Sequence, residues 1–273
     1  MPEGPEIRLA ADKIARVLIG EPLRKVILTP PLIQDYEEVL RGATVTAVDT
    51  RGKAMLTHFD NGLVMYSHNQ LYGRWYTSKL PKLPKTTRSL RVAFDTDSHT
   101  ARLYSATDID ILERDKLAQH PFLRAIGPDV LDKKTTAAKI LKRLKSDRFS
   151  GRAFGNLYLD QHFLAGIGNY LRSEILWCAG VFPTSRPRDL GDERLKKLAG
   201  ETLKISRRSY KTRGITVTPS LAKRLRNSGT RYADYRHFVF TPDGQPCYVC
   251  GSSVERTDVG SRKLFYCPTC QQR

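Results

Sequence analysis

The chain has 273 residues, of which 40% are hydrophobic, and a formal net charge of +18 at pH 7. A chain of this length can bury a sizeable core, in one large domain or in two to three smaller ones. Its longest apolar stretches are far shorter than the roughly 20 residues of a transmembrane helix, and its acidic N-terminus does not resemble a signal peptide. We therefore expect a cytoplasmic protein with no membrane partner.

The chain begins with MPEGPE, in which Pro2 and two glutamates fall within about one helical turn. Proline suits a first helical position and acidic side chains suit the positive end of a helix, so a helix is expected to begin here. Removal of Met1 would also leave the secondary amine of Pro2 as the chain terminus. A free α-amine has a pKa of about 8 and is a nucleophile near neutral pH. Pro2 is therefore a candidate catalytic residue.

The first part of the chain, residues 1–128, is predicted to be a β-rich domain with an N-terminal helix. Apolar residues at helical spacing place that helix near 5–19. Short alternating runs follow, each bounded by Gly, Asn, Asp or Pro; they are ATVTAVDT, AMLTHF, LVMYSH, LRVAF and ARLYS. The stretch GPDVLD is interpreted as the connector to the next domain.

From about 133 to 213 the apolar pattern becomes helical. Helices are predicted for TTAAKILKRLK, YLDQHFLAG, NYLRSEILWCAG and DERLKKLAGETLKISRRSY. The turn that ends at Asn169 precedes a helix, whose free N–H groups could bind an anion such as phosphate; Asn169 as an ordinary N-cap is the alternative. Residues 214–235 are polar, basic and weakly patterned, which predicts a flexible or ligand-ordered loop.

The positive charge is concentrated in the second half of the chain. Residues 1–120 contain 17 basic and 15 acidic residues, whereas residues 121–273 contain 29 and 13. Two segments, 133–152 and 186–236, carry most of this excess. One basic run is usually a solvated face, but two runs of the same sign favour a nucleic-acid partner.

Two Cys-x-x-Cys pairs lie near the C-terminus, separated by sixteen residues; they are Cys247, Cys250, Cys267 and Cys270. This spacing is typical of four thiolates that bind one Zn²⁺, and cytoplasmic proteins rarely hold two disulfides instead. Such a short segment cannot support a core alone, so the zinc is expected to be structural. The residues between the pairs predict a β-hairpin with Arg262 near its tip, as a phosphate contact or a solvated turn residue.

Five motifs together resemble one known family. They are MPEGPE, the Lys53 segment TRGKAML, HNQLYGRW, AGIGNYLRSEIL and the Cys₄ ribbon with SRKLFYCPTC. In combination, and above all through the initiating MPEGPE, they are similar to the formamidopyrimidine-DNA glycosylase/endonuclease VIII family. The resemblance covers nearly the whole chain.

The resemblance implies an α+β multidomain fold. Its parts would be an N-terminal β-sandwich with flanking helices at 1–128, a helix-two-turn-helix domain at 129–215, a flexible basic loop at 216–235 and a Cys₄ zinc finger at 236–273. The implied protein is a bacterial, nucleoid-associated monomer that holds one structural Zn²⁺. It would bind damaged double-stranded DNA, excise oxidised bases and then cleave the strand.

The resemblance also implies roles for individual residues. Pro2 would be the nucleophile, Glu3 the general acid and Glu6 a supporting carboxylate. Phosphate and backbone contacts would come from Lys53, Asn169 and Arg262, with Lys53 also near the reacting sugar.

The segment HNQLYGRW places Gln70, Leu71 and Tyr72 in an apparent turn where polar residues are usual. Apolar side chains in such a position suit a wedge that fills the gap left by a flipped base, although a turn folded onto the core is the alternative. Purine-excising relatives add an Arg and a Phe from a second loop, which LYSATDIDILERD lacks. We therefore expect oxidised pyrimidines as substrates.

Three other functions remain open from the sequence. The same chemistry could prefer oxidised purines, because the basic stretch 219–229 is longer than the endonuclease VIII pattern. A non-catalytic DNA-binding zinc protein would explain the charge but not the retention of Pro2, Glu3 and Lys53. A zinc-ribbon RNA-binding protein would likewise leave the N-terminus unexplained.

Overall fold

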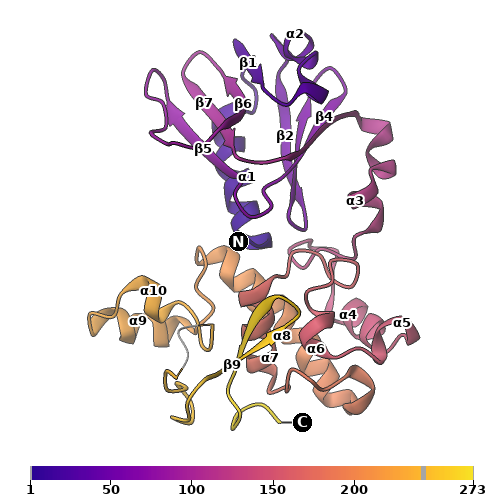
Figure 1. Ribbon diagram of the computed structural model, residues 1–273, viewed down its shortest axis with the longest axis vertical. Coiled ribbons are helices and arrows are strands. Elements are labelled where there is room, and N and C mark those ends of the chain that lie inside the picture. Colours follow the sequence, from indigo (N-terminus) through magenta and orange to yellow (C-terminus); the bar gives the residue numbers. More distant parts are fainter. Residues whose placement is uncertain (1, 241–243, 273) are drawn as a thin grey trace. The chain divides into compact units, whose positions relative to one another are not determined.

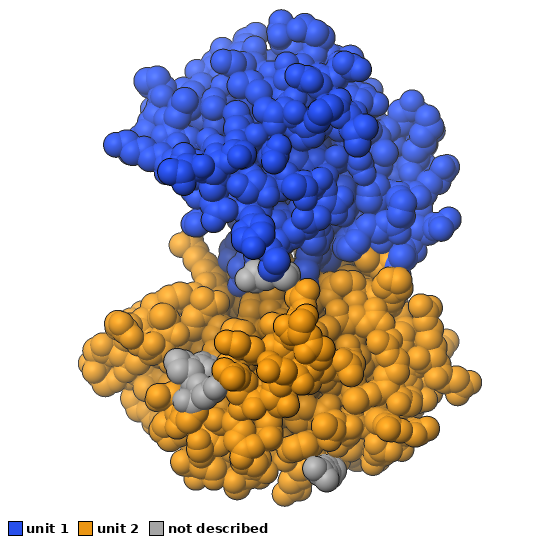
Figure 2. Space-filling model, in the orientation of Figure 1, with its two compact units in different colours: residues 1–2, 6–125 blue, residues 3–5, 126–273 orange. Residues whose placement is uncertain are grey.

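The computed structural model describes residues 2–240 and 244–272, which form two compact units (Figures 1 and 2). Unit 1 comprises residues 1–2 and 6–125, and unit 2 comprises residues 3–5 and 126–273. In the described part of the chain, every helix is too short or too polar to cross a membrane.

Unit 1 contains eight strands and five helical segments among its described residues. In chain order they are α1 (Gly4–Leu18), β1 (Lys25–Leu28), the 3-10 helix η1 (Pro31–Ile33), α2 (Tyr36–Leu40), β2 (Val45–Arg51), β3 (Ala54–Phe59), β4 (Leu63–His68), β5 (Arg74–Lys79), β6 (Leu90–Asp95), β7 (His99–Tyr104) and β8 (Asp108–Glu113), followed by η2 (Arg114–Gln119) and α3 (Pro121–Ala125). The strands form two antiparallel sheets, in the orders β1-β6-β7-β5 and β2-β3-β4-β8. All five runs predicted as strands are strands.

One hydrophobic core joins both sheets of unit 1 to α1. Phe59 of β3 and Phe94 of β6 come from different sheets, and their rings meet edge to face with centroids 5.7 Å apart. The apolar face of α1, including Ile7 and Ile14, is buried in the same core. Burial of each such side chain stabilises the fold by about 1.5–3 kcal/mol. The strands and the helix are therefore held together because their apolar faces are buried in the same core. The predicted β-sandwich is confirmed.

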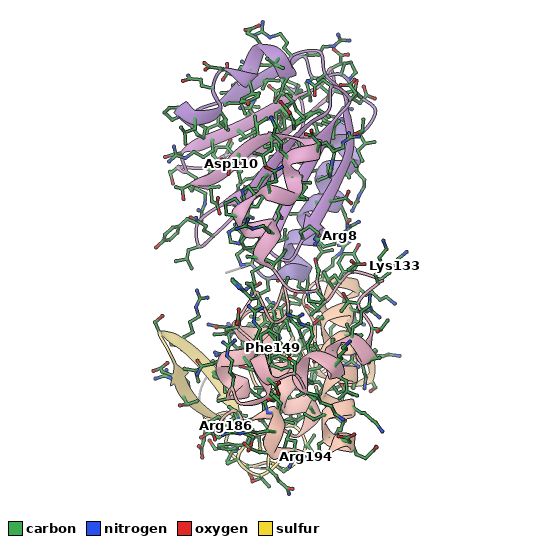
Figure 3. All side chains as sticks on the ribbon, turned by 90° about the vertical axis from the view of Figure 1, so that its right-hand side faces the viewer. Arg8, Asp110, Lys133, Phe149, Arg186 and Arg194 are labelled. Carbon is green, nitrogen blue, oxygen red and sulfur yellow. The ribbon has the colours of Figure 1, made fainter. Side chains whose placement is uncertain are left out.

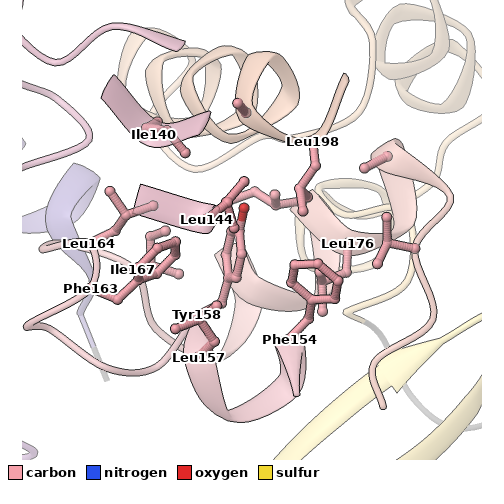
Figure 4. Close-up of a cluster of buried hydrophobic side chains, with 14 of the residues drawn as sticks. Ile140, Leu144, Phe154, Leu157, Tyr158, Phe163, Leu164, Ile167, Leu176 and Leu198 are labelled. Atoms are coloured by element: carbon pink, nitrogen blue, oxygen red, sulfur yellow. The ribbon is translucent and has the colours of Figure 1, made fainter. Parts of the chain in front are cut away.

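Unit 2 is helical, with a small hairpin near its C-terminus. Its elements are α4 (Ala137–Leu144), α5 (Asp147–Ser150), α6 (Phe154–Leu157), α7 (Asn169–Ala179), η3 (Pro187–Asp189), α8 (Asp192–Lys211), α9 (Pro219–Asn227), α10 (Tyr232–Tyr235), β9 (Glu255–Val259) and β10 (Arg262–Tyr266). Figure 4 shows part of its core, in which Tyr158 lies among leucine and phenylalanine side chains. The buried Tyr158 hydroxyl shares a 2.9 Å hydrogen bond with Thr202 of α8.

The helix predicted for YLDQHFLAG, residues 158–166, is wrong. These residues form successive turns after α6, because polar side chains satisfy the backbone instead of a helical ladder. The Asp160 side chain accepts from the His162 N–H at 2.8 Å, and the Gln161 amide bonds to the backbone of Gly166 and Ile167. Gly166, with φ +99°, then directs the chain into α7.

The segment 216–235, expected to be a loop, contains α9 and α10 instead. The Thr218 hydroxyl accepts from the Leu221 N–H at 3.3 Å, and Pro219 occupies the first turn, so α9 has a standard start. No residue of α9 is fully buried, and only Leu221 and Ala222 pack, partly buried, against the core, so this short segment offers few apolar positions that mark a helix. The basic side chains of α9 are exposed, and Figure 3 labels three further basic residues of unit 2: Lys133, Arg186 and Arg194.

The predicted hairpin between the cysteine pairs is confirmed. Strands β9 and β10 pair antiparallel with Val259 opposite Arg262, and Gly260 at φ +63° lies in the two-residue turn between them. Arg262 is therefore the first residue of β10, at the hairpin tip.

Candidate functional site

The carboxylate of Glu3 lies at the N-terminus of α7. Its oxygens accept hydrogen bonds from the backbone N–H groups of Gly168 at 2.6 Å, Tyr170 at 2.8 Å and Leu171 at 3.3 Å. Glu3 is only 3% exposed. A helix start has free N–H groups and a positive end of the macrodipole, so it is a strong binding site for a carboxylate. Glu3 is thus held by backbone atoms that do not depend on any side-chain rotamer.

Glycines allow this close approach. A Cβ at Gly168 would lie 2.4 Å from Cδ of Glu3, and Gly4 donates its N–H to the Gly166 carbonyl at 2.8 Å. Two expectations from the sequence are corrected here. Gly168, not Asn169, is the N-cap residue of α7, and N–H groups expected to be free for phosphate are bonded to Glu3. The anion at this helix start belongs to the chain itself.

The side chain of Arg172 is fully buried in the first turns of α7. It donates to the carbonyls of Gly155 at 2.7 Å and Lys263 at 2.9 Å, so it connects α7 with β10. Burial lowers the pKa of Arg172 to about 10, with Glu3 opposing and Arg262 reinforcing that shift. Arg172 therefore remains charged at neutral pH and brings the hairpin to the start of α7. Sequence reasoning missed it, although Arg172 and Glu174 within the mainly apolar NYLRSEILWCA were a signal of a buried polar network.

Asn169 and Arg262 both lie in the part of unit 2 that Arg172 organises. Asn169 is the first residue of α7, and its side-chain oxygen is 3.5 Å from the Arg172 guanidinium. Arg262 is adjacent in sequence to Lys263, whose carbonyl Arg172 holds. The structure thus gathers Glu3, Asn169 and Arg262 around one buried guanidinium.

The other residues proposed for the N-terminal site belong to unit 1. Pro2 is half-buried, and Glu6 is a half-buried residue of the first turn of α1. Met1, whose removal the sequence argument requires, lies outside the described residues. Pro2 is bonded directly to Glu3, so anchoring of Glu3 also restricts the chain terminus.

Lys53 lies in the two-residue turn between β2 and β3, next to Gly52 at φ +62°. Its residue is only 8% exposed. His68, the last residue of β4, lies close enough to Lys53 for the lysine charge to affect its pKa. Burial lowers the pKa of His68, Asp108 raises it and Lys53 lowers it again. His68 was not identified from the sequence as a functional residue.

Residues 69–73 form a tight turn between β4 and β5. The turn is closed by the Gly73 N–H, which donates to the Asn69 carbonyl at 2.7 Å. Leu71 is 59% exposed and Tyr72 69% exposed, although both are large apolar residues. The alternative in which this turn folds onto the core is therefore excluded for these two side chains.

The four cysteines form a single cluster in unit 2. All four Sγ atoms lie within 4.8 Å of one another, with Cys247 and Cys270 3.8 Å apart and Cys250 and Cys267 3.4 Å apart. Disulfides would require sulfur atoms about 2 Å apart, and all four thiols are free. Four sulfurs around a tetrahedral ion with bonds of about 2.3 Å would be about 3.8 Å apart, so the donor set fits a metal ion.

Comparisons with known proteins agree with these features. Family models match the formamidopyrimidine-DNA glycosylase N-terminal domain at residues 1–108, the formamidopyrimidine-DNA glycosylase H2TH domain at 126–220, and the zinc finger found in FPG and IleRS at 244–273.

Full-length relatives and solved structures extend the match. The chain is 47% identical over 272 residues to Endonuclease 8 of Salmonella schwarzengrund, with 100% of both chains covered. It is also 47% identical to Endonuclease 8 of an Escherichia coli strain, covering 99% of this chain and 100% of the relative. The fold matches Fpg of Lactococcus lactis, solved with DNA containing N7-benzyl-Fapy-dG, with a TM-score of 0.82, 20% identity and complete coverage of both chains. The chain therefore belongs to the formamidopyrimidine-DNA glycosylase/endonuclease VIII family of DNA-repair enzymes.

Proposed function

We propose that this protein is a bifunctional DNA glycosylase and abasic-site lyase of base excision repair, with oxidised pyrimidines in duplex DNA as its substrates. The observation that carries this proposal is the N-terminal pair Pro2-Glu3, whose glutamate is fixed by the backbone of α7. Family membership and the basic second half of the chain support DNA as the partner.

The chemistry follows from the secondary amine of Pro2. Its nitrogen lone pair attacks C1′ of the deoxyribose, and the damaged base leaves with the electrons of the glycosidic bond. The attack leaves the Pro2 nitrogen as an ammonium, which gives up its one N–H proton. Opening of the sugar ring then gives a cationic iminium, which has no nitrogen proton left to shed. This cation withdraws electrons from C2′, so loss of a C2′ proton expels the 3′ phosphate, and a second elimination expels the 5′ phosphate.

Glu3 is proposed to protonate the ring oxygen as the sugar opens. Its backbone contacts hold it as a carboxylate, so it must first take up a proton, and the proton that Pro2 loses before the iminium forms supplies it. Glu6 is the proposed supporting carboxylate. The DNA backbone would be bound by Lys53, Asn169 and Arg262, because charge-assisted hydrogen bonds are the strong contacts to phosphate.

The proposed lesion class rests on the 69–73 turn. A base must leave the helix before C1′ is accessible, and Gln70, Leu71 and Tyr72 are proposed to fill the vacated space. The connection between β7 and β8 has only three residues, 105–107, and supplies neither Arg nor Phe. Saturated pyrimidines also stack weakly, which lowers the cost of flipping them out.

The metal is proposed to be one structural Zn²⁺ per chain, held by the four-cysteine cluster. Bound zinc would stabilise a segment too small to fold alone. Elemental analysis of the purified protein should give one zinc per chain, and Cys250→Ser should release it while the N-terminal amine stays intact. A zinc-free protein that still binds DNA at full affinity would contradict this role.

Borohydride trapping tests the nucleophile. Reduction of the iminium should join the protein covalently to DNA that contains an abasic site, and peptide mapping should locate the bond at Pro2. Pro2→Gly, or retention of Met1, should suppress the adduct strongly. An adduct at Lys53 would overturn the assignment.

The lesion class is tested by single-turnover excision from matched duplexes with thymine glycol or 8-oxoguanine. Thymine glycol should be released faster, and Leu71→Ala should slow that release. Faster release of 8-oxoguanine would favour the purine alternative, which the length of the basic segment 219–229 keeps open.

A further inference from the structure

We propose that Thr107, Arg88 and His68 act as positioning residues that hold the 69–73 turn in one conformation before DNA binds. This inference rests on the proposed wedge function of that turn. In this proposal the short β7–β8 connection supports the 69–73 turn. It does not supply a second set of wedge residues.

The turn itself is tightly constrained. Gln70 has φ +49°, a left-handed backbone conformation that residues other than glycine rarely adopt. A Cβ at Gly73 would lie 2.5 Å from the Asn69 carbonyl oxygen, so only glycine can close the turn as it stands. Strained backbone persists only where surrounding contacts determine it.

Three side chains from separate segments supply those contacts. The Gln70 N–H donates to Nδ1 of His68 at 3.1 Å, and the Thr107 hydroxyl donates to Oε1 of Gln70 at 2.7 Å. Nη1 of Arg88 donates to the carbonyl of Tyr72 at 2.6 Å. The first two contacts fix the start of the turn and the third fixes its end, which leaves Leu71 between them.

Two of the three bracing segments, those of Arg88 and Thr107, are also joined to each other. The Ser105 N–H donates to the Ser89 carbonyl at 2.8 Å, one residue from Arg88 and two from Thr107. Thr107 and Arg88 therefore belong to a single hydrogen-bonded frame beside the turn.

His68 can accept the Gln70 N–H only when Nδ1 carries no proton. The groups that act on its ring are Asp108, which favours protonation, and Lys53, which opposes it, while burial also favours the neutral form. The Phe122 ring also packs against it edge to face, with ring centroids 5.5 Å apart. His68 is thus neutral near pH 7, with its hydrogen on Nε2.

Ordering of the turn before DNA binds gives a reason for these contacts. A flexible loop would have to lose conformational freedom at the moment it entered the duplex, which weakens binding in that state. A turn that is ordered beforehand presents Leu71 and Tyr72 to the base stack without this loss.

The test uses Thr107→Val, which removes the hydroxyl at nearly constant shape, and Thr107→Ser, which restores it. Amide hydrogen exchange of a peptide spanning 66–76, in the DNA-free protein, should be faster in Thr107→Val. Single-turnover excision of thymine glycol should be about fivefold to tenfold slower in duplex DNA, in keeping with loss of one hydrogen bond. Excision from a single strand, where no base pair must be opened, should be unchanged.

Thr107→Ser should restore both readouts, and Arg88→Gln should act in the same direction as Thr107→Val. The matched control is Thr46→Val, which removes another exposed threonine hydroxyl, one that donates to the His58 carbonyl on a different strand. In the background of Leu71→Ala, Thr107→Val should cause less slowing than in the wild-type background, because Leu71 is one of the side chains that the brace presents.

Equal slowing on duplex and single-stranded DNA, or unchanged exchange at 69–73, would overturn the brace. If the wild-type protein excised no thymine glycol, the proposed function would fail, and the exchange measurement would still decide whether these residues order the turn.

Discussion

Glu3 and Gly168 are 165 residues apart in the sequence, yet the carboxylate of one is bonded to the N–H of the other. This contact depends on a single missing methyl group, because any side chain at Gly168 would occupy the space of the Glu3 carboxylate. The position of Glu3, the proposed general acid, thus depends on Gly168, a residue without a side chain.

Gly168→Ala should therefore displace Glu3 and abolish strand cleavage at abasic sites. Loss of the charge-assisted bonds should also lower the free energy of unfolding of unit 2 by about 2 kcal/mol. The matched control is Gly200→Ala in the interior of α8, where nothing lies within 4 Å of the added Cβ. That change should raise stability by roughly 0.5–1 kcal/mol.

Urea unfolding measures both variants. The chain has two tryptophans, Trp75 in unit 1 and Trp177 in unit 2, so a Trp75→Phe background lets fluorescence report unit 2 alone. A Gly168→Ala protein with unchanged stability and full cleavage would mean that the Glu3 contact has no such role.

At the scale of elements, α7 holds together the segments that follow it. The buried carboxylate of Glu174 accepts from the backbone N–H groups of Phe238, Val239 and Phe240, at 2.8, 2.8 and 2.9 Å. His237, which precedes Phe238, stacks on Tyr170 of α7 with ring centroids 5.0 Å apart. The chain that leads toward the cysteine cluster is therefore fixed to the helix that carries the Glu3 site.

This contact predicts acid sensitivity of unit 2. Burial lowers the pKa of His237 to about 3, with the charge of Arg236 adding to the shift. An unfolded chain takes up a proton on this histidine below about pH 6.5, whereas the folded chain does not, so the stability it contributes is present above pH 6.5 and is lost toward pH 3. The loss should be on the order of 3 kcal/mol at pH 4.

His237→Asn, which keeps a polar atom near the position of Nδ1, should remove this part of the pH dependence. The measurement is urea unfolding of Trp75→Phe proteins at several values between pH 7 and pH 4. Parallel pH profiles for the two proteins would show that His237 does not titrate in this way.

At the scale of the whole molecule, the charge is unevenly shared along the chain. Residues 121–273 carry 29 basic residues against 13 acidic ones, and Lys223, Arg224 and Arg226 on the exposed face of α9 are part of this excess. Binding to DNA should then release counterions in proportion to the phosphates that are neutralised.

Affinity for duplex DNA should consequently fall by about 10³-fold between 50 and 200 mM salt. Replacing Arg224 and Arg226 by Gln should make the plot of log affinity against log salt shallower by about one for each phosphate that is no longer neutralised. Lys13→Gln with Lys25→Gln in unit 1 is the control of equal charge, and its slope should be unchanged. Equal slopes for all three proteins, measured by fluorescence anisotropy, would exclude α9 from the DNA-binding surface.

The sequence by itself determined the features that depend on local spacing. Strands such as β3 and β4 follow from alternating polarity, α1 follows from its apolar stripe, and the cysteine cluster follows from two short knuckles, because each pattern describes neighbours along the chain. The resemblance carried by MPEGPE also identified the family, which the full-length relatives confirm.

Only the tertiary structure decided which partners meet across long separations. The sequence suggested free N–H groups at the start of α7, but Glu3 occupies them. It suggested a helix at 158–166, but side-chain bonds made turns there, and it left Arg172 unnoticed among apolar neighbours. In each case the observed structure satisfies a polar group with a hydrogen-bond partner. Some of these partners lie far away in the sequence, and others are local side-chain bonds that compete with a helix of similar stability. The periodicity of apolar residues reveals neither kind.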